Sequence, residues 1–264
     1  MKNRIEKRLA ALQREGKKAL VAFVTAGDPH LKWTPQVVLE LEKAGADVIE
    51  LGMPFSDPMA DGPVIQKSSE RALKAGTTLK GIFQAVAKIR KTSEIPILLM
   101  GYFNPVLQYG IPEFFAAAKR AGVDGALLVD LPPEEGEEVR RAAKAEGISL
   151  VYLLSPTSGR ERIDLVRRKG SGFIYYVSLT GVTGAAIRST QSLHQKLKEV
   201  VKDSPLPVCV GFGIKTADQA AAVARDADGV VVGSALVDCF AKSPPKQAIA
   251  KVSRLVRSMS KKIH

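Results

Sequence analysis

The chain has 264 residues, of which 45% are hydrophobic, and this combination is typical of a globular protein with a sizeable core. No apolar run approaches the ~20 residues of a membrane-spanning helix, and the first twenty residues lack the apolar core of a signal peptide, so we expect a cytoplasmic protein without membrane contact. The formal net charge of +12 does not indicate nucleic-acid binding, because Lys and Arg are spread over many segments and aromatic residues make up only 6%.

The predicted elements begin with a short amphipathic helix. Ile5, Leu9 and Leu12 recur at helical spacing within residues 1–18, and Glu6 and Glu15 argue against an organelle-targeting peptide. We interpret this segment as a helix that caps the rest of the fold.

Eight short β-branched segments then alternate with amphipathic stretches. The predicted strands are Ala19–Val24, Val48–Leu51, Ile97–Met100, Ala126–Val129, Leu150–Leu154, Phe173–Val177, Val208–Val210 and Val230–Val232. Their helical partners are Thr34–Lys43, Leu79–Lys91, Pro112–Arg120, Glu134–Ala145, Arg160–Lys169, Ser189–Val201, Ala217–Ala224 and Lys246–Met259. Extra helices are expected after the second strand, over Val64–Ala75, and after the eighth, over Ala235–Phe240.

Strict strand–helix alternation over this length predicts an α/β protein whose single domain, residues 1–264, is a closed (β/α)8 TIM barrel. An open doubly wound sheet is the alternative, but no GxGxxG motif follows the first strand to support it. In the closing helix the cations surround one apolar stripe, which favours a solvated outer face over a functional patch. Cys209, Cys239 and the three His are scattered, so neither a disulfide framework nor a metal site is predicted.

The second strand carries a carboxylate among apolar residues. Val48, Glu50 and Gly52 share one face of this strand, and because the strand is expected to be buried on both faces, Glu50 must lie among apolar neighbours. Burial raises the pKa of a carboxylic acid and suits it to exchange a proton near neutral pH. The alternative is a structural Glu that is paired with an unseen Arg or Lys.

A stiff acidic loop follows this strand. Pro54, Pro58 and Pro63 restrict its backbone, and it holds Asp57 and Asp61. Because active sites of such barrels lie at the carboxyl ends of the strands, Glu50 and Asp61 are the first candidates for catalysis.

Other strand ends also offer candidate residues. Tyr102 and Asn104 follow the third strand, and Asp130 follows the fourth, where it is either functional or a turn or cap residue. In the sixth strand, Tyr175 and Tyr176 point to opposite faces, so one of them faces the barrel interior.

Glycines end the seventh and eighth strands. Gly211 and Gly213 follow one, and Gly233 and Ser234 follow the other at the start of a short helix. Glycines let the backbone approach an anion, and free N–H groups at a helix N-terminus point at it, which indicates a phosphate site. The long sixth connection, with Gly181, Thr183 and Gly184, is either a lid over the same ligand or an ordinary loop.

The sequence contains no Ser/His/Asp set, no cluster of metal-binding residues and no Walker motif. Hydrolysis by a nucleophilic side chain or a metal ion is therefore disfavoured. A phosphorylated substrate and two carboxylates suit an isomerase or a carbon–carbon lyase. Reasoning from the residues leaves both open.

Several motifs are similar to those of the tryptophan synthase alpha subunit family: ELGMPFSDPMADGPVIQ, GYFNP, DGALLVDLPPEE, GFIYYVSLTGVTGA, and GFGIKT followed by GSA. The resemblance covers nearly the whole chain. It implies a lyase that cleaves indole-3-glycerol phosphate into indole and glyceraldehyde 3-phosphate by a retro-aldol reaction, without a cofactor of its own. It also implies an alpha2beta2 heterotetramer with a beta subunit that carries pyridoxal phosphate and receives the indole.

The resemblance assigns roles to individual residues. Glu50 matches the general acid/base and Asp61 the second carboxylate, which binds the indole N–H and is expected to stay ionised in its polar loop. The matching substrate-pocket residues are Phe23, Tyr102, Tyr175, Thr183 and Phe212, and the phosphate contacts are Gly184, Gly213, Gly233 and Ser234. The partner-interface positions are Pro54, Asp57, Asn104 and Asp130.

Two positions depart from the family pattern. Leu179 stands where some relatives carry Arg, and Leu9 stands where Phe is frequent. The alternatives are another phosphate-binding barrel, such as indole-glycerol-phosphate synthase or phosphoribosylanthranilate isomerase, and a catalytically weak subunit that mainly activates a partner. The two-carboxylate loop argues against the first, and the intact Glu50, Asp61 and phosphate glycines argue against the second. The resemblance does not explain the basic charge.

Overall fold

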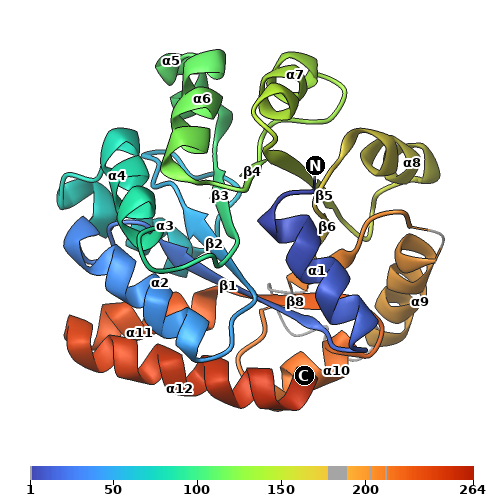
Figure 1. The fold of residues 1–264 in the computed structure, drawn as a ribbon. Coiled ribbons are helices and arrows are strands. Elements are labelled where there is room, and N and C mark those ends of the chain that lie inside the picture. The colour runs from blue at the N-terminus through green and yellow to red at the C-terminus, as the bar shows by residue number, and fades with distance from the viewer. Residues whose placement is uncertain (1, 178–188, 203, 212) are drawn as a thin grey trace.

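The computed structural model describes residues 2–177, 189–202, 204–211 and 213–264. Eight parallel strands close into a barrel in chain order, each hydrogen-bonded to its neighbours, with β8 against β1 (Figure 1). The predicted TIM barrel is therefore confirmed. The strands are β1 (Ala19–Thr25), β2 (Val48–Gly52), β3 (Ile97–Gly101), β4 (Gly125–Leu128), β5 (Ser149–Leu154), β6 (Ile174–Val177), β7 (Val208–Gly211) and β8 (Gly229–Val232).

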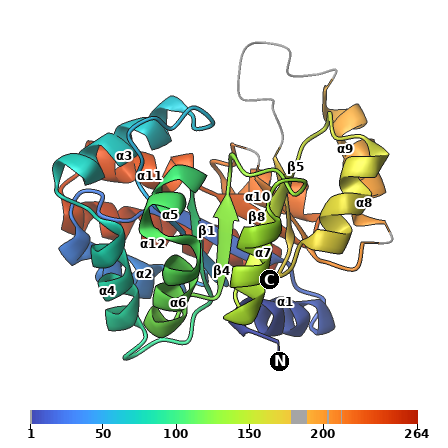
Figure 2. The same cartoon turned by 90° about the horizontal axis from the view of Figure 1, so that it is seen from above.

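Helices surround the barrel, as Figure 2 shows from a second direction. They are α1 (Arg4–Arg14), η1 (Leu31–Trp33), α2 (Thr34–Lys43), α3 (Pro63–Lys74), α4 (Leu79–Ile89), α5 (Phe103–Tyr109), α6 (Ile111–Ala121), α7 (Glu137–Ala145), α8 (Arg160–Lys169), α9 (Ser189–Val201), α10 (Ala217–Ala224), α11 (Ser234–Lys242) and α12 (Pro245–Ile263). The extra helices expected after the second and eighth strands are α3 and α11.

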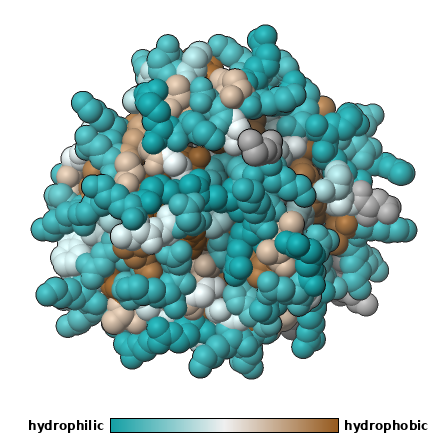
Figure 3. Space-filling model, in the orientation of Figure 1, coloured by the Kyte–Doolittle hydropathy of each residue, from teal (hydrophilic) through white to brown (hydrophobic). Residues whose placement is uncertain are grey.

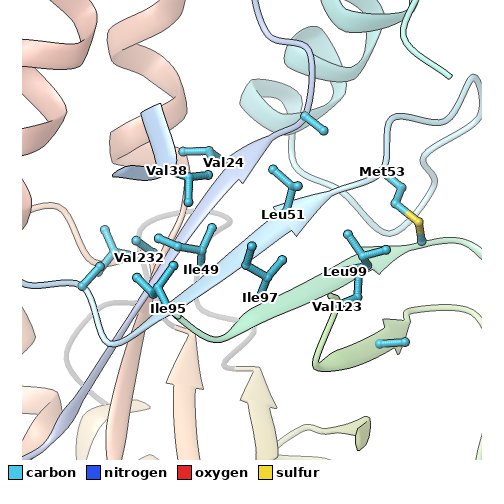
Figure 4. Close-up of a cluster of buried hydrophobic side chains, with 14 of the residues drawn as sticks. Val24, Val38, Ile49, Leu51, Met53, Ile95, Ile97, Leu99, Val123 and Val232 are labelled. Atoms are coloured by element: carbon cyan, nitrogen blue, oxygen red, sulfur yellow. The ribbon is translucent and has the colours of Figure 1, made fainter. Parts of the chain in front are cut away.

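The side chains form two apolar layers because strand residues alternate in direction. Outward residues such as Ile49 and Leu51 pack against the helices, and Figure 4 shows part of this layer. Inward residues such as Val48 and Leu98 fill the barrel with Ile5, Leu9 and Leu12 of α1. The N-terminal helix therefore closes the end of the barrel where the strands begin, as the sequence predicted.

Polar caps secure this same end of the barrel. The side chain of a residue just before each even-numbered strand accepts a hydrogen bond from a backbone N–H of the preceding odd-numbered strand. The four bonds are Asp47 with Leu20 at 2.7 Å, Asp124 with Ile97 at 2.9 Å, Ser171 with Leu150 at 2.8 Å and Asp228 with Val208 at 2.8 Å. The acceptors satisfy N–H groups at the strand starts, where burial without a partner is costly.

Two connections differ from the sequence prediction. Helix α5 was not expected because Asn104 and Pro105 are typical of a loop, but Pro105 lies in the first turn, where no N–H is needed. Helix α7 begins at Glu137 rather than Glu134, because the backbone after Pro132 forms a turn that bonds Glu135 and Gly136 to its carbonyl.

The outer surface is mostly polar. The face across which α1 lies is covered largely by hydrophilic residues, with small apolar areas between them (Figure 3). None of the helices in the described part of the chain combines the length and apolar character that a membrane crossing requires.

Candidate functional site

Glu50 lies inside the barrel, paired in register with Phe23 of β1 and Leu98 of β3. The residue is 0% exposed, and within the described residues neither carboxylate oxygen has a hydrogen-bond partner. The alternative of a structural ion pair therefore finds no support in the described part of the chain. Burial, with a smaller contribution from the negative charge of Asp61, raises the pKa of Glu50 to about 8. Glu50 is thus a neutral acid at pH 7.

Asp61 lies in the loop between β2 and α3. Its backbone N–H donates to the Pro58 carbonyl at 3.1 Å, which forms a tight turn before the helix. Burial raises the pKa of the carboxyl, and a hydrogen bond with the Tyr102 hydroxyl opposes that rise. The expectation that Asp61 stays ionised in its loop remains a prediction, because burial in the cleft disfavours the charged form while the Tyr102 hydroxyl favours it.

A narrow cleft lies at the carboxyl ends of β1 to β4. Phe23, Asp61 and Tyr102 line it, together with Met100 and Val129. The structure thus brings two of the predicted pocket residues beside Asp61. The walls are apolar and aromatic with one carboxylate at the rim, an arrangement that suits a flat aromatic ligand with a polar N–H.

Tyr175 is the tyrosine of β6 that faces inward. It packs with the inner layer, stacking on Phe173 with ring centroids 6.5 Å apart, whereas Tyr176 belongs to the outer layer. Burial and the nearby charge of Glu50 raise the pKa of Tyr175 well above its usual value. A Cβ at Gly211 would lie 2.6 Å from the Tyr175 hydroxyl, so this glycine makes room for the ring.

Glycines also shape the opposite wall. A Cβ at Gly52 would lie 2.7 Å from the Phe23 ring, and sequence reasoning did not identify this role for Gly52. A glycine inside an otherwise apolar strand is the signal that could have revealed it.

The predicted phosphate residues lie at the ends of β7 and β8. Gly213 has a φ of +57° with open space where a Cβ would point, so a side chain there would strain the backbone. Gly233 is the N-cap of α11, Ser234 is its first residue, and no side chain caps this helix start. Unpaired N–H groups at a helix N-terminus favour an anion.

The predicted interface residues lie around the same end of the barrel. Pro54 is half-buried, Asp57 and Asn104 are exposed, and Asp130 is exposed while its carboxylate accepts a 2.8 Å hydrogen bond from Phe103 N–H. Asp130 therefore caps the N-terminus of α5. A cap residue was one of the two roles expected for Asp130, but the helix that it caps begins 27 residues earlier in the chain. Two apolar side chains are also exposed on these segments, namely Met59 at 92% and Leu107 at 50%.

Three predicted residues, Thr183, Gly184 and Phe212, lie outside the described residues. Among the residues that the structure describes, no group of three or more His, Cys, Asp or Glu could hold a metal ion. Sequence reasoning also missed Gln66 and Phe55, which contact the Asp61 loop and Tyr102. Phe55 and Tyr102 are 47 residues apart, so no local pattern reveals their contact, whereas the position of Gln66 in the first turns of the helix that follows Asp61 is a local signal that could have found it.

Comparisons with known proteins agree on one family. A family model described as the tryptophan synthase alpha chain matches residues 9–264. The tryptophan synthase alpha chain of Geotalea uraniireducens is 58% identical over 90% of this chain and 89% of its own, and that of Citrifermentans bemidjiense is 54% identical over 97% and 96%. The crystal structure of tryptophan synthase subunit alpha from Legionella pneumophila has a TM-score of 0.91 at 43% identity, and the match covers 100% of this chain and 99% of that one.

Proposed function

This chain belongs to the tryptophan synthase alpha chain family, and from that premise we propose how its own residues divide the reaction. The enzyme is a carbon–carbon lyase of tryptophan biosynthesis that cleaves indole-3-glycerol phosphate to indole and glyceraldehyde 3-phosphate and passes indole to a beta subunit. Membership of this family sets aside the other phosphate-binding barrels considered from the sequence.

Glu50 is the proposed general acid and base. Its protonated carboxyl donates a proton to indole C3, and the resulting carboxylate takes a proton from the glycerol hydroxyl next to the ring. The bond between indole C3 and the glycerol carbon then breaks, the hydroxyl carbon becomes the aldehyde, and the bonding electrons return to the ring. The proton count of Glu50 is restored. Its complete burial, and the lack of a hydrogen-bond partner for either oxygen among the described residues, carry this assignment.

Asp61 is the proposed partner of the indole N–H. Positive charge develops on the ring nitrogen when C3 is protonated, and a carboxylate at the cleft rim stabilises that charge. The cleft position of Asp61, across from Phe23 and beside Tyr102, supports this role. Phe23, Tyr102, Tyr175 and Phe212 are the proposed contacts of the indole ring, and Thr183 is proposed to reach Asp61 from the sixth connection.

The phosphate group is proposed to bind where β7 and β8 end. Gly213, Gly233 and Ser234, with Gly184, would direct backbone N–H groups at the phosphate oxygens. The start of α11, which has no side-chain cap, supports this placement. Binding there would hold the substrate by its distal end and leave the indole to Glu50 and Asp61.

The beta subunit is the proposed partner, in an alpha2beta2 heterotetramer whose pyridoxal phosphate lies in the beta subunit. The interface proposed here comprises Pro54, Asp57, Asn104 and Asp130, beside the exposed Met59 and Leu107. Exposed apolar side chains on the segments that carry the site favour a partner on this face. The proposed reaction uses the residues of this chain and no cofactor within it. A cytoplasmic location stays a prediction.

The test is indole release from indole-3-glycerol phosphate, measured with and without a beta subunit. We expect slow release by the chain alone, strong acceleration by the partner and loss of at least about 100-fold in Glu50→Gln, since general acid–base catalysis contributes that much. Glu146→Gln, at the C-terminal end of α7 away from the cleft, is the matched control and should keep full activity. An active Glu50→Gln enzyme would refute the assignment.

A further inference from the structure

We propose that Tyr102 and Gln66 are positioning residues that hold Asp61 in place, Tyr102 from the segment that follows β3 and Gln66 from α3. This inference rests on the proposed role of Asp61. Within the described residues, these two side chains donate or accept the side-chain hydrogen bonds made with the backbone of residues 58–61.

Tyr102 holds the loop through its hydroxyl. The Ala60 backbone N–H donates to Tyr102 Oη at 2.9 Å, so the phenol oxygen is already an acceptor and its own O–H is free to donate. The Asp61 carboxylate lines the same cleft as Tyr102, and its interaction with this hydroxyl lowers the pKa of Asp61 against the effect of burial. One hydroxyl therefore contacts the loop backbone and favours the charged form of the catalytic carboxylate.

The ring of Tyr102 is itself fixed. It is 6% exposed, and it stacks on Phe55 with ring centroids 5.1 Å apart and an interplanar angle of 30°. Tyr102 is also the N-cap residue of α5, whose first N–H donates to Asp130 at 2.8 Å. Ring packing on one side and a capped helix on the other leave the hydroxyl little freedom to move away from Asp61.

Gln66 holds the same loop from α3. Its amide Nε2 donates to the Asp61 carbonyl at 2.8 Å and lies 3.4 Å from the Pro58 carbonyl, so it spans the turn that ends in Asp61. The helix is in turn fixed to β1, because Ser68 Oγ lies 2.6 Å from Thr25 Oγ1 and Arg71 makes paired bonds of 2.8 and 2.7 Å to Asp28. Gln66 thus joins the loop to a rigid support.

The effects of Tyr102 and Gln66 on Asp61 can be distinguished by the pKa of the Asp61 carboxyl. The titratable side chains that face Asp61 in the described residues are Glu50 from β2, Tyr102 after β3 and Tyr175 from β6. Tyr102 bonds to the carboxylate, whereas Gln66 bonds to the backbone carbonyl of the same residue. Loss of the Tyr102 hydroxyl therefore raises the pKa of Asp61, while loss of the Gln66 amide displaces Asp61 without removing a donor from the carboxylate.

The experiment compares Tyr102→Phe and Gln66→Met with wild type, in the presence of the beta subunit. We expect kcat for indole release to fall about 10- to 100-fold in Tyr102→Phe, since an ångström-scale misplacement of a catalytic group costs about 100-fold, and about two- to tenfold in Gln66→Met. The acidic limb of kcat/KM moves to higher pH in Tyr102→Phe and stays in place in Gln66→Met. Binding of glycerol 3-phosphate is unchanged in both.

The matched controls are Tyr152→Phe, whose hydroxyl has no hydrogen-bond partner among the described residues, and Gln247→Met on the exposed side of α12. Both should retain wild-type kinetics. An unchanged kcat in Tyr102→Phe, an unmoved acidic limb, or an equal loss of glycerol 3-phosphate binding would overturn the positioning role. If the wild-type chain released no indole even with the beta subunit present, the proposed function itself would be overturned.

Discussion

At the residue scale, the protonation of Glu50 links the site to the stability of the fold. The carboxyl is fully buried, and in the part of the chain that the structure describes its oxygens have no hydrogen-bond partner. Ionisation inside the barrel is therefore costly, and burial raises the pKa of Glu50 in the folded state to about 8, against a usual value of 4.5. Because the folded state binds the proton more tightly, the chain loses stability as pH rises from the unfolded-state pKa to the folded-state pKa. Below pH 4.5 Glu50 carries no such cost, and above pH 8 the cost is fully present.

Glu50→Gln should therefore be more stable than wild type at high pH. We expect near-equal free energies of unfolding at pH 5 and an advantage for the Gln variant that grows to a few kcal/mol at pH 9. Urea unfolding of both proteins at pH 5, 7 and 9 measures this difference. A difference that does not change with pH would mean that Glu50 is not held as a neutral acid.

The sequence could predict where Glu50 lies but not how it is solvated. Strand periodicity predicts that Glu50 is buried, whereas its lack of a hydrogen-bond partner among the described residues depends on side chains from other strands. The same limit applies to Asp61, whose polar loop suggested an ordinary carboxylate. The pKa of Asp61 depends on Tyr102, which directly follows β3, and no local sequence pattern shows that these two residues interact.

At the element scale, polar residues at the strand starts fix the end of the barrel opposite the site. Asp124 is 3% exposed; its carboxylate accepts the Ile97 N–H and bonds to Arg4 at 3.0 Å and Arg90 at 2.7 Å. The Arg90 side chain is itself only 10% exposed. Removing the carboxylate therefore leaves a strand N–H without its acceptor and the largely buried Arg90 with backbone carbonyl partners but without the negative charge beside it.

We expect Asp124→Ala to lower the free energy of unfolding by about 3–5 kcal/mol, the usual cost of breaking a buried ion pair. Asp218→Ala is the matched control, because its carboxylate is 85% exposed and pairs with Lys262 at 3.0 Å on the surface. That variant should change stability by less than about 1 kcal/mol. Chemical denaturation at pH 7 measures both, and equal effects would argue against the importance of the strand-start caps.

The elements also show which parts of the fold a sequence can reveal. Amphipathic periodicity and β-branched runs are local, and the predicted α2, α8, α9 and α10 have the observed bounds. Helix α5 was not predicted because the motif GYFNP is typical of a loop. The residue that caps this helix, Asp130, lies 27 positions after Phe103, so the local sequence does not show the cap.

At the scale of the whole molecule, the two ends of the barrel have different tasks. The end where the strands begin is closed by α1 and by the buried caps. The end where they finish holds the cleft, the glycines of the proposed phosphate site and the exposed Met59 and Leu107. Stability and chemistry are therefore separated along the barrel axis. The TIM barrel follows from strand–helix alternation, whereas the separation appears only when the strand ends are seen together.

The exposed apolar residues of the cleft end should contribute to the proposed beta-subunit interface. Because Met59 is 92% exposed and Leu107 is 50% exposed, burying them against a partner removes apolar surface from water, while a charge at either position would be buried without a partner. We expect Met59→Lys and Leu107→Lys each to weaken beta-subunit binding about 10- to 100-fold, the cost of losing a central contact. The slow indole release of the isolated chain should change little.

Titration of the beta subunit against indole release measures this affinity, because the half-maximal acceleration moves to higher partner concentration when binding weakens. Leu73→Lys is the matched control: Leu73 is 36% exposed near the C-terminal end of α3, away from the cleft. That variant should titrate like wild type. Unshifted titrations of Met59→Lys and Leu107→Lys would place the partner on another face, since two new charges at a buried interface could not leave its affinity unchanged.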